Sequence, residues 1–368
     1  MPLAVLVGLL LLGFHSFSQW EKQNPGQEVT ARVLTVDNEE VQSAGAAHIG
    51  HQALWIRILT GPEKGREYPA ANLLTGHNDV ETLLRPGDKI IAALMVSPAG
   101  TTTVKAVDLY RQDSLFILFG LFVAALLIYA RMVGVKALIS FILTLVILWQ
   151  VLVRYILAGV HPLAVTALTL VLLSGVIIFL VAGWNRKGLT AFLGTLSGLG
   201  ISLALIALFG GRSGLLGMTQ PHVNALIFAG FHQLDIQAIF YSAVVLGASG
   251  AAMDVSVDIA AAMGEIQRKK PDIPPEELVQ SGINVGRQVM GTMTTTLLLA
   301  YAGGYLTLLL LFQVQSPSPL RMLNLQIVAA EIMRILVGST GLVLVAPITA
   351  FVGGYLLTRP KAKPPSAP

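Results

Sequence analysis

Blocks of apolar residues, each about as long as a membrane-spanning helix, recur along the chain with polar connections between them. An apolar segment at residues 2–19 precedes a mixed polar region that extends to about residue 113. Seven further apolar blocks follow, near residues 114–133, 137–157, 162–183, 188–210, 237–263, 286–313 and 327–357. A helix of roughly 20 apolar residues crosses the hydrocarbon core of a bilayer. The pattern therefore predicts a membrane α-helical bundle with an N-terminal hydrophobic segment plus about seven transmembrane helices.

The two ends of this pattern need separate interpretation. The last block is long, so we expect Leu320–Arg334 to form an interfacial helix that leads into a core span from Ile335. The N-terminal segment, residues 1–20, has no basic start and ends in Ser16-Phe17-Ser18. It is either an uncleaved anchor, which we favour, or a cleaved signal, and both leave the next domain outside.

Between residues 21 and 113 the apolar residues change to an approximate period of two. Short alternating runs lie around residues 29–34, 54–58 and 104–107, with turns rich in Gly, Pro and Asp between them. This alternation is typical of β-strands. The region therefore predicts a small extracytoplasmic all-β domain, a barrel or sandwich of five to seven strands. Its histidines are interpreted as ordinary surface residues: His48, His51 and His77.

Positive charges near the helix ends predict the orientation. When the loops are assigned alternately to two sides, eleven Lys and Arg residues lie on one side and three on the other. Cytoplasmic loops carry the excess of positive charge, so the C-terminus should be cytoplasmic. The predicted parts are the N-terminal segment 1–20, the β domain 21–113, the transmembrane domain 114–358 and a basic Pro-rich tail 359–368.

The composition agrees with a membrane setting. Hydrophobic residues make up 54% of the 368, charged residues make up 12%, and the mean hydropathy is +0.71. The absence of cysteine excludes disulfides and thiolate sites. Basic residues are dispersed among helix ends without interleaved aromatic residues, so we expect the lipid bilayer and not nucleic acid as a partner.

Two carboxylates, Asp254 and Asp258, interrupt the apolar block at 237–263. Each costs about 2.5–3.5 kcal/mol at the centre of an inserted helix, so such residues usually have a function. The two aspartates are four residues apart and therefore share one helix face. The small residues at 247–252 let another helix approach closely. A rise of about 1.5 Å per residue from Glu265 puts Asp258 roughly 10 Å and Asp254 roughly 16 Å into the membrane. We predict a proton or monovalent cation site. The alternative is a pair that only holds helices together.

Further polar residues extend this candidate site. The following helix supplies three of them: Arg287, Thr292 and Thr295. Arg287 is expected to pair with Asp258, which leaves the other carboxylate to titrate. Glu331 and Arg334, three residues apart, form a second predicted pair, although an interfacial helix explains them equally well. Polar residues on the predicted outer side are interpreted as solvated loop residues: His161, His222, His232 and Asp235.

Enzyme signatures are missing from the sequence. It has no Walker lysine loop, no His-Glu-x-x-His and no nucleophile elbow. An intramembrane aspartyl protease needs its two Asp on different helices, whereas Asp254 and Asp258 share one. We therefore predict a protein that is not an enzyme and that has no cofactor and no metal site.

Several motifs carry a family resemblance. They are Gly247-Ala-Ser-Gly-Ala-Ala-Met-Asp254-Val-Ser-Val-Asp258, Ser281-Gly-Ile-Asn-Val-Gly-Arg287 and Glu331-Ile-Met-Arg334-Ile-Leu-Val-Gly338-Ser339. With the Pro86-Gly87-Asp88 turn of the β domain, they resemble the YibE/F family of bacterial multipass membrane proteins. The resemblance implies a seven-helix block behind a small exported domain, located in the bacterial inner or plasma membrane. It implies no particular activity.

Residues 250–300 are also similar, more faintly, to helices of SecD/SecF and of resistance-nodulation-division proteins. There an intramembrane Asp precedes a polar loop, an Arg and a threonine-rich helix start. This similarity would imply proton-driven conformational work, although the number of helices differs. Two hypotheses follow: an ion-coupled transporter or membrane machine using Asp254, or a membrane-embedded assembly partner whose exported β domain binds another protein.

Overall fold

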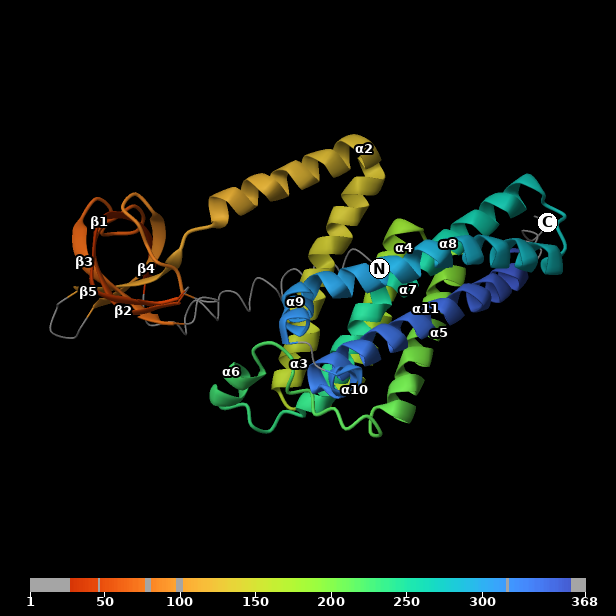
Figure 1. Cartoon of the computed structure of the whole chain (residues 1–368). Helices are drawn as coiled ribbons and strands as arrows, with labels where there is room; N and C mark the ends of the chain where they lie inside the picture. The colour runs from red at the N-terminus through yellow and green to blue at the C-terminus, as the bar shows by residue number, and fades with distance from the viewer. Residues whose placement is uncertain (1–26, 46, 77–80, 97–101, 316–317, 359–368) are drawn as a thin grey trace. The chain divides into compact units, whose positions relative to one another are not determined.

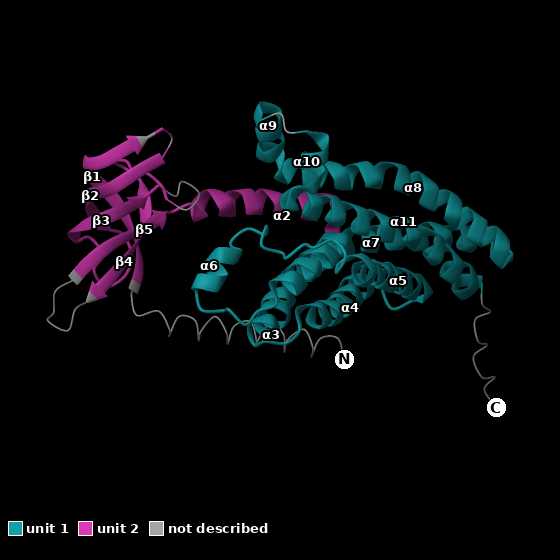
Figure 2. Cartoon of the chain, turned by 60° about the horizontal axis from the view of Figure 1, so that its bottom comes forward, with its two compact units in different colours: residues 1–10, 132–368 teal, residues 11–131 magenta. Residues whose placement is uncertain are grey.

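The computed structural model describes residues 27–45, 47–76, 81–96, 102–315 and 318–358. The chain divides after Arg131 into two compact units, which Figure 2 shows in different colours. The described residues up to Arg131, magenta in Figure 2, are the first unit along the chain (unit 2 in the figure key), and those from Met132 onward, teal, are the second (unit 1 in the key). The predicted N-terminal segment, His77 and the tail 359–368 lie outside the described residues.

Five strands form a closed barrel in the first unit (Figure 1). They are β1 (Gln27–Ala44), β2 (Ala47–Ile58), β3 (Glu67–Thr75), β4 (Lys89–Val96) and β5 (Thr102–Leu109). The order is β1-β2-β3-β5-β4, with β4 pairing back onto β1. Only the β3–β5 contact is parallel, through Ala70–Val104 and Ala71–Lys105. The prediction of a small all-β domain is confirmed, and its strand order is that of an OB barrel, a fold that hosts many functions.

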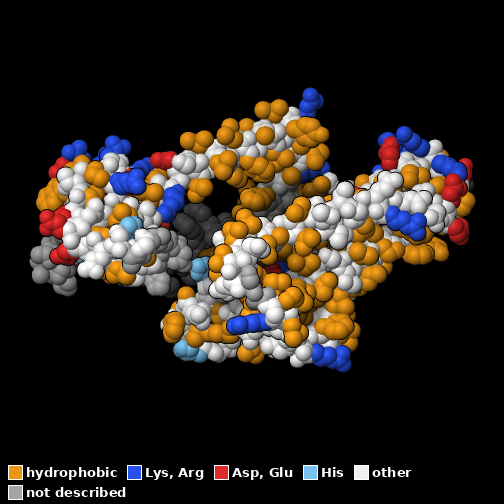
Figure 3. Space-filling model, in the orientation of Figure 1, with side chains coloured by type: hydrophobic (Ala, Val, Ile, Leu, Met, Phe, Trp, Pro, Cys, Tyr) orange, Lys and Arg blue, Asp and Glu red, His pale blue; other side chains and the backbone are white. Residues whose placement is uncertain are grey.

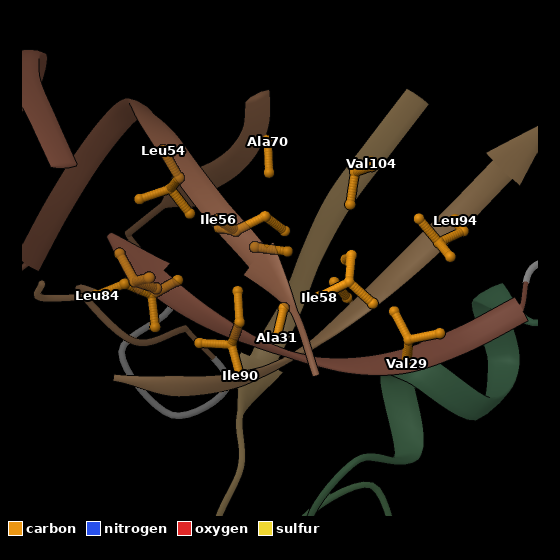
Figure 4. Packing of buried hydrophobic residues seen from close by; sticks show 13 residues of the cluster. Val29, Ala31, Leu54, Ile56, Ile58, Ala70, Leu84, Ile90, Leu94 and Val104 are labelled. Atoms are coloured by element: carbon orange, nitrogen blue, oxygen red, sulfur yellow. The ribbon is translucent and has the colours of Figure 1, made fainter. Parts of the chain in front are cut away.

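Alternation along the strands builds the barrel core. On β2, Leu54, Ile56 and Ile58 point inward, and the intervening residues are exposed. Figure 4 shows these three side chains converging with inward residues of the other strands. One polar side chain, Gln52, is fully buried. Its amide donates to the Asn38 side chain and the Leu84 carbonyl, 2.8 and 2.9 Å away, and its oxygen accepts from Leu84 N at 3.1 Å.

Helices make up the rest of the described fold. In chain order they are α2 (Gln112–Ile147), the π-helix η1 (Leu148–Val153), α3 (Arg154–Leu157), α4 (Pro162–Val181), α5 (Arg186–Phe209), α6 (Val223–Phe228), α7 (Ile236–Lys269), α8 (Pro275–Gly304), α9 (Leu306–Gln315), α10 (Pro319–Asn324) and α11 (Gln326–Thr358). Among the described helices, five are long and apolar enough to cross a membrane, or six if α8 and α9 count as one span. A membrane bundle is therefore supported, and the number of about seven spans stays a prediction.

Three helix boundaries differ from the expected ones. α2 covers the first predicted block and the first half of the second, and it breaks at Arg131, where φ is 47° and ψ is −122°. The expected block 286–313 is split between α8 and α9, which meet at an angle of 71°. The expected division of the last block at Ile335 is not seen, because α10 ends at Asn324 and α11 runs unbroken from Gln326 through Ile335. An interfacial position of residues 320–334 stays a prediction.

Close helix contacts hold the second unit together. α5, α7, α8 and α11 pack against one another, and α4 packs on α5 and α7. At the crossing of α5 and α11, a Cβ added to Gly198 would overlap the Val345 side chain. Small residues permit such approaches between membrane helices. On the outside of the helices, hydrophobic side chains cover much of the visible surface, and charged side chains gather toward helix ends (Figure 3).

Candidate functional site

Helix α7 places the two aspartates on its open face. Asp235 caps the helix by accepting a hydrogen bond from Ala238 N at 2.9 Å. The exposed positions recur every three or four residues: Gly247, Gly250, Asp254, Asp258 and Ala261. Residues with this spacing lie on one side of a helix. The opposite side of α7 is buried against α5, α8 and α11. Both carboxylates therefore project from the one face of α7 that its neighbours leave open.

No counter-charge accompanies the aspartates in the described part of the chain. Asp254 and Asp258 form no ion pair within 4.0 Å there, although each lies in the electric field of the other. The expected partner, Arg287, is exposed and is not paired with Asp258. Its neighbour Gly286 faces α7 and α11, since a Cβ there would lie 3.2 Å from Ile259 Cδ1. One residue further on, about 100° around the helix, Arg287 is turned away from that contact.

The threonines of α8 lie on an exposed stretch of the helix. Thr292 donates its hydroxyl hydrogen bond to the Val289 carbonyl at 3.1 Å, and Thr296 donates to the Thr292 carbonyl at 3.0 Å. Thr295 is exposed as well. Hydroxyls bonded back to the preceding turn are common in membrane helices. The structure therefore brings Thr292 and Thr295 onto the helix beside α7 without a direct hydrogen bond to either aspartate.

The predicted pair of Glu331 and Arg334 lies on α11 and is largely buried. Arg334 Nη2 lies 3.5 Å from Glu331 Oε1, and the two side chains are only 17% and 12% exposed. The same guanidinium donates to Gln220 Oε1 at 3.0 Å. Three buried atoms of this cluster have no hydrogen-bond partner among the residues that the structure describes: Glu331 Oε2, Arg334 Nε and Gln220 Nε2. Tyr305, between α8 and α9, lies beside the Glu331 carboxylate. The cluster is a buried polar site inside an apolar helical unit.

Gln220 reaches this site because the loop after α5 is fastened to the bundle. Tyr241 donates to the Gly210 carbonyl at 2.7 Å, and Gln237 donates to the Leu215 carbonyl at 2.6 Å. Both donors come from α7. Sequence reasoning missed Gln220, since a glutamine in a Gly- and Ser-containing loop, 114 residues before Arg334, carries no local signal.

Tyr301 connects the buried cluster with the open face of α7. Its side chain interacts electrostatically with Arg334 and Glu331. Its hydroxyl lies 3.3 Å from the position of a Cβ built on Gly247. Gly247 precedes Asp254 by two helical turns on the same face, roughly 10 Å along the axis. Tyr301 thus lies between the Glu331–Arg334 pair and the face of α7 that bears the aspartates, two helical turns before Asp254.

The histidines stay apart from these groups. His161 and His222 lie at the starts of α4 and α6. In the barrel, His48 Nδ1 lies 3.2 Å from Ser43 Oγ, and His51 Nδ1 lies 3.8 Å from Glu40 Oε2. Across the described ranges, no three His, Asp or Glu residues are grouped to hold a metal ion.

Comparison with known proteins places the chain in a family. The family model described as YibE/F-like protein matches residues 118–359. The searches of curated proteins and of solved structures gave no match. The matched range contains both aspartates, the Glu331–Arg334 pair and all helices from α4 to α11. With its long apolar helices, this chain belongs to the YibE/F-like protein family of membrane proteins.

Proposed function

We propose that the chain is an ion-coupled transporter or membrane machine in which Asp254 takes up a proton or a monovalent cation. One observation carries the proposal: Asp254 and Asp258 share an open face of an apolar helix and have no cationic partner within 4.0 Å in the described chain. Intramembrane carboxylates normally face a pairing group, a water-filled cavity or an ion. The proposal includes no catalytic step and no cofactor.

Electrostatics favours binding of a positive charge at this pair. Side chains four residues apart on a helix lie about 6 Å from each other. Two negative charges at that distance repel by about 3 kcal/mol at an effective dielectric constant near 20. A proton or a monovalent cation on Asp254 removes this repulsion and also reduces the cost of keeping the carboxylate in the membrane. Asp258, closer to the predicted cytoplasmic end, then serves as the next acceptor.

The buried cluster in α11 supports a second station on the same route. Glu331 carries a carboxylate oxygen without a partner, and Tyr301 lies between this cluster and the face that bears Asp254. Proton relays in membrane proteins use such series of carboxylates and polar groups. With the C-terminus cytoplasmic in a bacterial cell membrane, the Glu331 cluster lies toward the outside and Asp258 toward the cytoplasm.

Proton flux into liposomes tests this function. Purified protein is reconstituted, a pH gradient is imposed, and the wild type is compared with Asp254→Asn at equal amounts of folded protein. The matched control is Asp272→Asn, which removes an exposed carboxylate from the connection between α7 and α8. We expect flux to be lost in Asp254→Asn and kept in the control. Wild-type flux through folded Asp254→Asn would remove this residue from the mechanism.

A second function is favoured by the outer face of the barrel. Large apolar side chains on β2 and β3 are about half exposed: Ile49 at 49%, Trp55 at 45% and Leu73 at 56%. A protein that docks on this face would make the chain an assembly partner. We expect Trp55→Ser to reduce cross-linking to such a partner in cells, and Glu28→Ser, an exposed change on β1 opposite β4, to leave it intact. Equal cross-linking of both variants and the wild type would argue against docking there.

A further inference from the structure

Three cations from two helices gather at one end of the second unit. Arg268 on α7 forms an ion pair with Glu265, 2.6 Å between Nη2 and Oε1. The same carboxylate also lies in the field of Lys269 on α7 and of Lys187 on α5. Three positive charges therefore surround a single negative one. This excess is available to an anion.

The side chain of Lys187 lies in the space that a glycine of α7 leaves free. A Cβ added to Gly264 would overlap the Lys187 side chain, and it would come within 2.6 Å of Cδ and 2.9 Å of Cγ. The aliphatic stem of Lys187 thus lies directly across the α7 backbone. Its ammonium group acts electrostatically on Glu265, the carboxylate with which Arg268 pairs. The cluster is positioned by packing and does not consist only of mobile surface chains.

An aromatic residue marks the same end of the helices as a membrane interface. Trp184 precedes α5 in the turn from α4, is 79% exposed, and stacks on Phe179 with ring centroids 4.3 Å apart. Asn185 caps α5 by accepting from Gly188 N at 2.9 Å. Exposed tryptophans are enriched at the headgroup level of bilayers. Basic groups between helix ends at this level are suited to lipid phosphate.

We propose that Lys187, Arg268 and Lys269 form a binding site for the phosphate headgroup of an anionic phospholipid. The lipid is favoured over a free anion because Trp184, which places the site at the bilayer surface, precedes α5 by only two residues. Phosphate oxygens accept hydrogen bonds from the two ammonium groups, and the positive end of α5 adds to the attraction. The site is independent of ion coupling at Asp254.

Binding of phosphatidylglycerol to the full chain tests the proposal. Native mass spectrometry of detergent-solubilised protein measures retention of phosphatidylglycerol against phosphatidylcholine. The double variant Lys187→Gln, Lys269→Gln is compared with Arg212→Gln, Arg321→Gln, which removes two exposed arginines outside the cluster. We expect the first to bind phosphatidylglycerol roughly thirty-fold more weakly, since each of two cations is lost, and the second to bind like the wild type.

A second variant separates position from charge. Gly264→Leu keeps every cation but displaces the Lys187 stem, and we expect it to lose most of the preference for phosphatidylglycerol. Lys269→Gln alone, an exposed change that leaves packing intact, should weaken binding about five-fold. Wild-type binding by the Lys187, Lys269 double variant, or equal loss in the arginine control, would overturn the site. Displacement of the lipid by millimolar inorganic phosphate would reassign it to a soluble anion.

Discussion

The buried Glu331–Arg334 pair allows a sharp test of whether charge in this unit is structural or functional. Glu331→Gln keeps the size and most of the hydrogen-bonding capacity of the side chain but removes its charge. Arg334 then keeps its hydrogen bond to the Gln220 side-chain oxygen but loses the negative charge that compensates its own. The double variant Glu331→Met, Arg334→Met removes both charges and fills the space with apolar atoms.

The magnitude follows from the geometry of the pair. Two unit charges separated by 3.5 Å attract by about 5 kcal/mol at an effective dielectric constant near 20. Removing one partner of a buried pair typically costs about 3–5 kcal/mol, because the other charge is left uncompensated. We therefore expect Glu331→Gln to lower the free energy of unfolding by about 3–5 kcal/mol. The double methionine variant should be close to the wild type or more stable.

Unfolding by sodium dodecyl sulfate in mixed micelles, followed by circular dichroism, measures these free energies. Glu265→Gln is the control, since Glu265 and Arg268 are exposed, and its stability should equal that of the wild type. A loss below about 1 kcal/mol for Glu331→Gln would refute the reasoning, because exposed pairs contribute no more than that. If the double variant is stable and still passes protons in liposomes, the pair is structural. A stable double variant without flux would place it on the ion route.

Two further predictions concern packing in each unit. Gly198→Ala should lower the free energy of unfolding by about 1–3 kcal/mol, because the added methyl group overlaps Val345. The control on the same helix is Gly200→Ala, where a Cβ meets nothing within 4 Å, and this change should be neutral or stabilising by up to about 1 kcal/mol. Equal stability of the two variants in mixed-micelle unfolding would contradict the close helix contact. Gln52→Leu should destabilise the barrel by roughly 2–6 kcal/mol, because the N–H and C=O of Leu84 each lose a buried partner worth about 1–3 kcal/mol. Hydrogen exchange of the β2 and β3 amides measures this loss, and unchanged protection would show that the buried amide is dispensable.

The hydrophobic periodicity of the sequence was sufficient to predict which segments form helices and which form strands. Twenty-residue apolar blocks became long helices, and alternation around Leu54–Ile58 became a strand with one face in the core. In both cases the buried residues recur with a pattern that is typical of the element, and this pattern can be read from a single sequence. The break at Arg131 lies beside the boundary between the predicted blocks 114–133 and 137–157. Its positive φ was not predictable, because the residue at that position is an arginine and not a glycine. The sequence did not indicate the continuous start of α11, because the length of the last apolar block favours a division into two helices.

The candidate residues were predictable by type but not by environment. An apolar context identified Asp254, Asp258, Glu331 and Arg334, because ionisable groups there are costly and therefore conspicuous. Which pair would be buried depends on the rotation of each helix and on the loop that carries Gln220. Those features arise from packing between segments more than a hundred residues apart. Sequence spacing does not show how helices are rotated, and the Arg287–Asp258 pair that it predicted is not formed in the structure.

The strand order of the barrel determines when each pair of strands can form during synthesis of the chain. β1 is made first, yet its pairing with β4 joins Gln27–Arg32 to Lys89–Leu94, about sixty residues later in the chain. Closure cannot occur until β4 has emerged, and the short β3–β5 contact waits for β5. Contacts so distant in sequence slow folding. The helix that follows, α2, begins three residues after β5 ends. The first apolar helix after the barrel is therefore synthesised directly after the last strand that the barrel needs for closure.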